Sequence, residues 1–135
     1  MIHLDTSFLV DLLRERRQGE PGPATGLLRD RLSEEELAVS LHVACELYAG
    51  AELAGDPRQE RGAVRKLCSS LRVTHPGEDF PSAYGRLLGQ LRRAGTPVST
   101  MDLLIAAAAL QDEAALVTRN ARHFRLVPGL DLIDY

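Results

Sequence analysis

Short apolar runs recur along this chain, and segments with helical periodicity separate each run from the next. The runs are three or four residues long, which suits strands buried in a sheet. A chain that alternates short strands with helices tends to return to the sheet in the same direction each time. The pattern therefore predicts an α/β fold with a mainly parallel sheet. The predicted strands cover residues 2–4, 37–40, 71–74, 115–118 and 130–133.

Local signals mark where the intervening helices begin and end. Thr6 or Ser7 can cap the first helix, and Gly95 is placed to end a helix over residues 80–94. Ser99 or Thr100 can cap a strongly apolar helix that follows. Together these signals predict helices near residues 8–13, 24–32, 43–53, 58–70, 80–94 and 101–111, with a turn or short helix at 120–124.

Length and composition indicate one folded unit. With 135 residues, 44% of them hydrophobic, the chain can bury roughly two-thirds of its unfolded surface in a single domain over residues 1–135. Such a core needs no disulfide, so Cys45 and Cys68 need not pair. No apolar run approaches the ~20 residues that span a bilayer, and residues 1–5 do not resemble a signal peptide. We expect a protein without a membrane segment that works in the reducing cytoplasm.

The basic residues are almost all arginines. Of 16 lysines and arginines only Lys66 is a lysine, and guanidinium groups suit bidentate contact with phosphate. A net charge of −3 nevertheless argues against a simple basic nucleic-acid-binding module. An arginine-rich composition alone could give the same count. The positions of the arginines therefore matter more than their number.

Three acidic side chains fall in apolar surroundings. Asp5 ends the first predicted strand, Glu46 lies in the helix after the second, and Asp102 lies near the start of the apolar helix. Parallel sheets bind ligands beyond the carboxyl ends of their strands. Buried carboxylates repel one another unless a cation balances them, and oxygen ligands favour Mg²⁺ or Mn²⁺. The chain has no CxxC or HxxxH spacing that would indicate zinc.

Each of these acids also has a purely structural explanation. Asp5 could cap the helix that follows it. Asp102 could stabilise a helix N-terminus through the helix dipole. Glu46 could be an ordinary exposed glutamate. The joint occurrence of the three, within the local sequences described next, favours a metal site.

Four sequence blocks, in order, carry a resemblance to a known family. They are residues 2–11 (IHLDTSFLVD), Glu46-Leu47 with Gly50, residues 102–107 (DLLIAA) and residues 116–124 (LVTRNARHF), and residues 127–130 (VPGL) also fit. The chain resembles the PIN-domain ribonucleases, specifically the VapC-type toxins of toxin–antitoxin pairs, over nearly its whole length. The resemblance implies a three-layer α/β fold with about five parallel strands flanked by helices. It also implies three or four acids around one or two Mg²⁺ or Mn²⁺ ions.

The resemblance assigns the metal ligands residue by residue. Asp5, Glu46 and Asp102 match the three acidic positions of the family site. Asn120 stands at a fourth position, where the family often has aspartate, and a neutral amide is a weaker ligand for a second metal. Asp112 lies two to three helical turns beyond Asp102, so we expect it to point elsewhere.

Hydroxyl and arginine side chains complete the site that the resemblance implies. Ser7 and Thr118 match small hydroxyl residues that orient a ligand carboxylate or a water, although helix capping by Ser7 and strand-end polarity of Thr118 are alternatives. Arg119 and Arg122 flank Asn120 and are candidates for weak contacts with RNA phosphates, which position a strand without reading its sequence. Solvated surface charge is the alternative for either arginine. The histidines share no spacing and are expected in packing or surface roles.

The implied activity is metal-assisted hydrolysis of RNA phosphodiester bonds, leaving 5′-phosphate and 3′-hydroxyl ends. The implied substrates are tRNA, rRNA or mRNA. The implied partner is a VapB-type antitoxin whose C-terminal segment wraps the toxin and places an arginine in the acidic pocket. The family also commonly forms homodimers that pair into larger toxin–antitoxin assemblies, so we expect the same here.

Two other interpretations stay open. A catalytically silent PIN fold could bind RNA or protein, with Asn120 as a first sign of lost activity, although the intact acids count against this. A phosphoacceptor enzyme or switch could use Asp5. The phosphatase pattern, however, has a second aspartate where this chain has Ser7, and Lys66 is badly placed for a receiver domain.

Overall fold

The computed structural model describes residues 1–135 and contains one sheet of five strands. All strand pairs are parallel, and the strand order is β3-β2-β1-β4-β5. The predicted parallel α/β fold is confirmed, and each strand begins and ends within two residues of its predicted bounds. The strands are β1 (Ile2–Leu4), β2 (Leu37–Ser40), β3 (Arg72–Thr74), β4 (Ala115–Val117) and β5 (Leu132–Ile133).

Seven helices connect these strands, and none is long and apolar enough to cross a membrane. The first helix extends well beyond its apolar run because the polar residues 14–18 continue it until Gly19, whose positive φ of 72° ends the helix. Gly95 adopts the same left-handed conformation after α5. The helices are α1 (Thr6–Gln18), α2 (Pro23–Asp30), α3 (Leu41–Glu52), α4 (Pro57–Ser69), α5 (Phe80–Arg93), α6 (Thr100–Gln111) and α7 (Ala121–Phe124).

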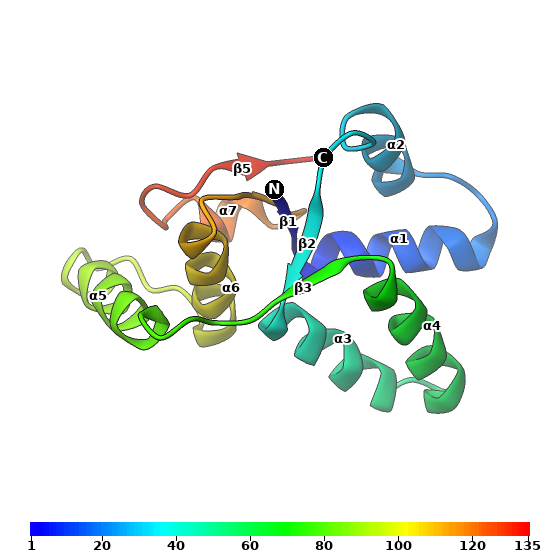
Figure 1. Cartoon of the computed structure of the whole chain (residues 1–135), viewed down its shortest axis with the longest axis horizontal. Helices are drawn as coiled ribbons and strands as arrows, with labels where there is room; N and C mark the ends of the chain where they lie inside the picture. The colour runs from blue at the N-terminus through cyan, green and yellow to red at the C-terminus, as the bar shows by residue number, and fades with distance from the viewer.

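The helices flank the sheet in layers. Figure 1 shows α5 and α6 on one side of the central strands and α1 and α2 on the other, with α3 and α4 packed against each other below them. Because the strands are parallel, their carboxyl ends meet at one edge, and α1 and α3 begin there directly after β1 and β2. Helix α6 leads back to the start of β4, so its first turn lies at the same edge. The fold thus brings residues near positions 5, 46, 102 and 118 together.

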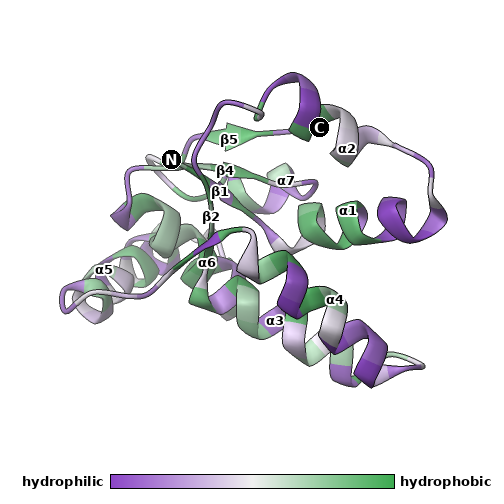
Figure 2. Ribbon diagram, turned by 45° about the vertical axis from the view of Figure 1, so that its right-hand side comes forward, coloured by the Kyte–Doolittle hydropathy of each residue, from purple (hydrophilic) through white to green (hydrophobic).

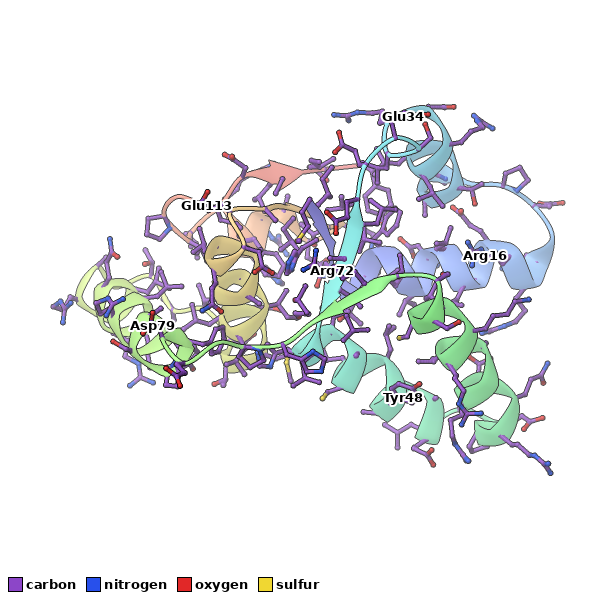
Figure 3. The ribbon with its side chains drawn as sticks, in the orientation of Figure 1. Arg16, Glu34, Tyr48, Arg72, Asp79 and Glu113 are labelled. Atoms are coloured by element: carbon purple, nitrogen blue, oxygen red, sulfur yellow. The ribbon has the colours of Figure 1, made fainter.

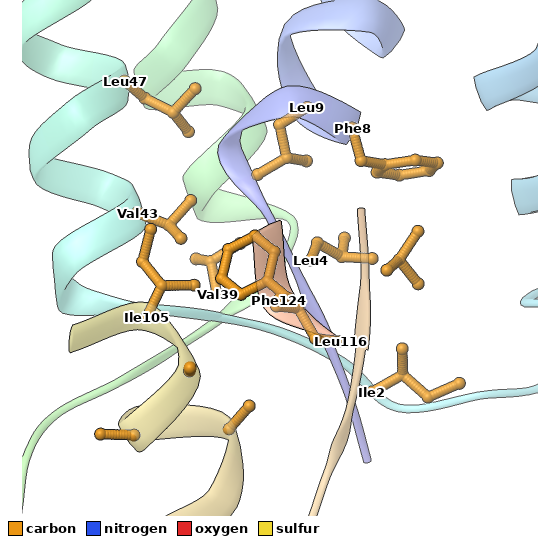
Figure 4. Close-up of a cluster of buried hydrophobic side chains, with 14 of the residues drawn as sticks. Ile2, Leu4, Phe8, Leu9, Val39, Val43, Leu47, Ile105, Leu116 and Phe124 are labelled. Atoms are coloured by element: carbon orange, nitrogen blue, oxygen red, sulfur yellow. The ribbon is translucent and has the colours of Figure 1, made fainter. Parts of the chain in front are cut away.

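One cluster of 26 buried hydrophobic side chains forms the core. The central strands and α6 are hydrophobic, whereas the far end of α1 is hydrophilic (Figure 2). The labelled Arg16, Glu34 and Asp79 lie on the outside of the molecule (Figure 3). Figure 4 shows part of this core, where side chains from strands and helices meet, among them Leu4, Val39, Leu116, Phe8, Leu9, Val43, Leu47, Ile105 and Phe124.

A buried glutamate on α1 holds the next helix in place. Glu15 Oε1 accepts a hydrogen bond from the amide of Ala24 (3.0 Å), and Oε2 accepts from the amide and the hydroxyl of Thr25 (2.7 and 2.6 Å). These bonds satisfy amides at the start of α2, which would otherwise have no partner. Gly22 completes the arrangement, because a Cβ there would overlap the Glu15 carboxylate.

The side chain of Asp112 contacts a buried histidine, His3. His3 lies in β1 with its Nε2 2.8 Å from Asp112 Oδ2, just past the end of α6. Burial lowers the pKa of His3 below its ordinary value, although the contact with Asp112 opposes that shift. Asp112 therefore points away from Asp102, as predicted, and His3 has the predicted packing role.

Phe124 anchors the short helix α7, and its loss should destabilise the protein. Phe124 is 1% exposed, so Phe124→Ala should lower the free energy of unfolding by about 3–5 kcal/mol through lost burial and a cavity. Leu53 is 89% exposed, so Leu53→Ala should change it by less than about 0.5 kcal/mol. Urea unfolding followed by circular dichroism measures both. Equal effects of the two substitutions would show that Phe124 is not part of the core.

Candidate active site

The carboxylate of Asp5 is buried at the end of β1, where it binds two hydroxyl groups. Its side chain is 3% exposed, and Oδ2 accepts hydrogen bonds from Ser7 Oγ (2.9 Å) and Thr118 Oγ1 (2.7 Å). Asp5 occupies the N-cap position of α1, yet its side chain makes no capping hydrogen bond. The capping explanation for Asp5 and Ser7 is therefore wrong.

Backbone amides fix the direction of both hydroxyl groups. The amide of Arg119 donates to Ser7 Oγ (3.1 Å), and the amide of Asn120 donates to Thr118 Oγ1 (2.9 Å). Because each hydroxyl oxygen already accepts a hydrogen bond, its own proton is directed at Asp5. The turn after β4 therefore holds the Asp5 carboxylate in one orientation. Oδ1 of Asp5 receives no donor from any side chain.

Asp102 lies close enough to Asp5 for their charges to interact. Ser99 caps α6, with its Oγ accepting from the Asp102 amide (3.3 Å), and Asp102 lies in the first turn, where a carboxylate also interacts favourably with the helix dipole. Burial raises the pKa of Asp5 above its ordinary value, and the nearby charge of Asp102 adds to that rise. Hydrogen bonds from Thr118 and Ser7 oppose the rise. Burial and the nearby charge of Asp102 therefore make the ionised form of Asp5 less favourable than it would be in water.

Glu46 is linked to the same edge of the sheet through Thr6. The Thr6 hydroxyl donates to Glu46 Oε1 at 2.6 Å, and Thr6 directly follows Asp5. Glu46 is half-buried on α3 rather than fully exposed. This contact was not predicted, although a hydroxyl residue next to Asp5 was a signal for it.

Arg119, Asn120 and His123 lie in the segment that follows Thr118, and each has different surroundings. Arg119 Nη1 donates to Asp11 Oδ1 at 2.6 Å, so its guanidinium group is already paired. Asn120 is exposed, and its side chain makes no hydrogen bond. His123, predicted in a packing or surface role, has its Nδ1 3.8 Å from Asp102 Oδ2 and so lies beside the site.

Asp11 is a buried acid that sequence reasoning missed. It is 4% exposed and binds Arg119, Arg14 Nη2 (3.0 Å) and the Tyr135 hydroxyl (2.7 Å). Burial, followed by the hydrogen bond to Asp11, raises the pKa of Tyr135. The only signal was an aspartate inside the apolar run 8–13. Through Arg119, Asp11 ties α1 to the turn that carries Thr118 and Asn120.

The donor groups fit a hard divalent cation, although they are not gathered into a complete ligand set. No group of three or more His, Cys, Asp or Glu side chains is arranged so that it could hold a metal ion. Ionised carboxylates repel one another when no cation lies between them. Asp5, Glu46 and Asp102 nonetheless contribute only carboxylate oxygens at one edge of the sheet, and such oxygens suit Mg²⁺ or Mn²⁺. The predicted ligand set stays a prediction.

Comparisons with known proteins agree with this architecture. The model of the PIN domain matches residues 2–130. Ribonuclease VapC19 of Mycobacterium tuberculosis is 35% identical over 127 residues, which cover 94% of each protein. The tRNA(fMet)-specific endonuclease VapC of Salmonella typhimurium is 30% identical, over 79% of this chain and 81% of that protein. The structure of VapBC-1 from nontypeable Haemophilus influenzae matches with a TM-score of 0.85 and 29% identity, covering 99% of this chain and 98% of that one.

These matches extend over nearly the whole chain. The chain belongs to the PIN-domain family and, within it, to the VapC-type ribonucleases. The resemblance first seen in four sequence blocks is therefore confirmed.

Replacing the Asp5 carboxylate should stabilise the fold. An aspartate whose pKa is raised by folding destabilises the native state at neutral pH, and the penalty disappears as falling pH protonates it. Asp5→Asn should therefore raise the free energy of unfolding near pH 7 by about 0.5–2 kcal/mol, with a smaller gain in acid. Urea unfolding as a function of pH measures this. Thr118→Val, which removes a donor to Asp5, should have the opposite sign; a destabilised Asp5→Asn would contradict the argument.

Proposed function

We propose that this protein is a metal-dependent endoribonuclease in which Asp5, Glu46 and Asp102 hold Mg²⁺ or Mn²⁺. The observation that carries the proposal is the buried Asp5 carboxylate, which Ser7 and Thr118 orient. Asp102 lies nearby, and burial raises the pKa of Asp5. Burying such a group costs stability and serves no capping purpose, which is typical of a functional site. One or two ions could bind, with Asn120 as the weaker fourth ligand.

Hydroxyl side chains hold the carboxylates of the proposed metal ligands in position. Ser7 and Thr118 both donate to Oδ2 of Asp5, and no side chain donates to Oδ1, which could face a cation. Thr6 holds Glu46 in the same way. A bound divalent ion would supply an activated water near neutral pH and neutralise charge on the phosphate. Since hydrolysis then needs no covalent intermediate, the site needs no nucleophilic side chain, and the products would carry 5′-phosphate and 3′-hydroxyl ends.

The substrate we propose is an RNA, either tRNA, rRNA or mRNA. A relative named as a tRNA(fMet)-specific endonuclease favours tRNA among the three. We place the activity in the cytoplasm, where these RNAs are found. A single hydrophobic cluster supports the inference that residues 1–135 act as one domain.

We also propose a VapB-type antitoxin as the partner, because a VapBC complex is among the similar structures. A cavity of about 340 Å³ lies between α1, α3 and α4 and could seat an antitoxin segment. Glu46 is part of its lining, so a segment lying there would reach the carboxylates, where a guanidinium group could pair with them. A homodimer and larger toxin–antitoxin assemblies stay predictions from the family.

Cleavage of total RNA by the purified protein tests the nuclease. With Mg²⁺ or Mn²⁺ we expect cuts at few sites, lost with chelator and in Asp5→Asn. Thr118→Val should slow cleavage about 10- to 100-fold, because it only loosens a ligand. The control is Asp30→Asn, since Asp30 is exposed and pairs only with Arg29. Sequencing the product ends checks the chemistry.

Two results of this experiment would reject the proposal. The first is cleavage that persists in folded Asp5→Asn. The second is a folded wild-type protein, free of antitoxin, that binds RNA without cutting it; this would favour the silent binding module. Phosphorylation of Asp5 by acetyl phosphate would instead favour the phosphoacceptor.

Asn120→Asp should strengthen metal binding. The exposed side chain makes no hydrogen bond, so a carboxylate there can turn toward a cation without breaking a contact. We expect the affinity for Mn²⁺, measured by calorimetry, to rise by about tenfold or more. Mutations of residues around other metal sites change metal affinity by a similar factor. An unchanged affinity would show that Asn120 does not face the metal.

A further inference from the structure

Another cavity borders the proposed metal site and shares no lining residue with the cavity between α1, α3 and α4. Its volume is about 470 Å³, which lies within the range of small-molecule sites. It is formed by the loop before α6, the first turn of α6, α7, and Leu126, which lies two residues beyond α7. We call it the α7 pocket. Its lining residues are Pro97, Val98, Ser99, Asp102, Arg122, His123 and Leu126.

The α7 pocket contains an arginine with no ion-pair partner. Three arginines follow β4 at intervals of three residues. Arg119 is paired with Asp11, and Arg125 Nη2 lies 3.5 Å from Asp134 Oδ2. Arg122 makes neither a salt bridge nor a hydrogen bond and lines the pocket. It is therefore the one cation of the three that is free to bind an external anion such as a phosphate.

The rest of the lining suits a flat, partly apolar group. Val98 and Pro97 provide an apolar wall, and Leu126 is an apolar side chain left 44% exposed. The His123 side chain is 53% exposed, so its ring is accessible for stacking. Proteins that bind single-stranded RNA stack unpaired bases on such rings and on guanidinium planes.

We propose that the α7 pocket binds one nucleotide of the RNA next to the cleaved bond. Its base lies against Val98, Leu126 and the His123 ring, and a phosphate lies on Arg122. Asp102 belongs both to the pocket and to the proposed metal site, so an occupant of the pocket is continuous with a strand that reaches the carboxylates. The inference rests on the proposed function, because it takes RNA as the substrate.

Titration of nitrogen-15-labelled protein with nucleoside 5′-monophosphates, in Mg²⁺, tests the pocket by NMR. Ribose 5-phosphate, which lacks a base, is the matched ligand. We expect shifted amides to concentrate at residues 98–99 and 122–126. Nucleotides should bind about five- to 100-fold more tightly than ribose 5-phosphate, the effect of stacking one base.

Variants separate the contributions of base and phosphate. Leu126→Ala should weaken binding of nucleotides and leave ribose 5-phosphate unchanged. Arg122→Gln should weaken both ligands. Arg125→Gln is the control, because it removes the same charge from a neighbouring arginine that is paired with Asp134. It should leave both affinities unchanged.

The proposal is overturned if shifts lie elsewhere, if ribose 5-phosphate binds as tightly as nucleotides, or if Arg125→Gln acts like Arg122→Gln. Specific capture of an antitoxin peptide by the α7 pocket, without nucleotide binding, would also overturn it. The binding measurement needs no turnover. Nucleotide binding without RNA cleavage would therefore reject the proposed nuclease activity and support the α7 pocket as a nucleotide site. RNA cleavage without nucleotide binding would support the nuclease activity and reject the nucleotide site.

Discussion

The hydrogen bonds around the Asp5 carboxylate join parts of the chain that are more than a hundred residues apart. Thr118 Oγ1 and Ser7 Oγ donate to one carboxylate oxygen, and the amides of residues 119 and 120 hold these hydroxyl groups in turn. The first strand, the first helix and the turn after β4 are thereby fixed at one point. Glu46, held by Thr6, and Asp102, on the first turn of α6, are arranged around that point. Asp5 and Asn120 belong to this network directly, and Thr6, the residue after Asp5, binds Glu46.

Burying the ionised Asp5 carboxylate lowers the stability of the folded protein, which is typical of a functional site. A carboxylate in the interior with a second acid nearby is disfavoured by burial and by repulsion, as the raised pKa of Asp5 indicates. The other buried acids differ in this respect. Glu15 is satisfied by amides of α2, and Asp11 by two arginines and a tyrosine hydroxyl. At Asp5, by contrast, both hydroxyl donors bind the same oxygen, Oδ2, and a second acid lies nearby, which favours this place for an external cation.

Sequence reasoning found the acids of the site but not the contacts that hold them. Asp5, Glu46 and Asp102 stood out because each interrupts an apolar segment and because the surrounding blocks resemble a family. Thr6 and Asp11 were missed, since a hydroxyl residue and an acid within a helix have many ordinary uses. Arg119 and Arg122 were treated alike, although only their surroundings distinguish them: Arg119 is paired with Asp11, and Arg122 is free.

The sequence by itself determined the order and type of the elements, because strand and helix periodicity and the capping signals are local properties of the chain. It also determined the family, since four blocks in order carry enough information. Tertiary structure alone decided which acids are buried, which arginine is available, and that His123 lies beside Asp102. These properties depend on contacts between residues such as Asp11 and Arg119, which are 108 residues apart in the sequence. Local sequence patterns such as helical periodicity do not reveal contacts over such a distance.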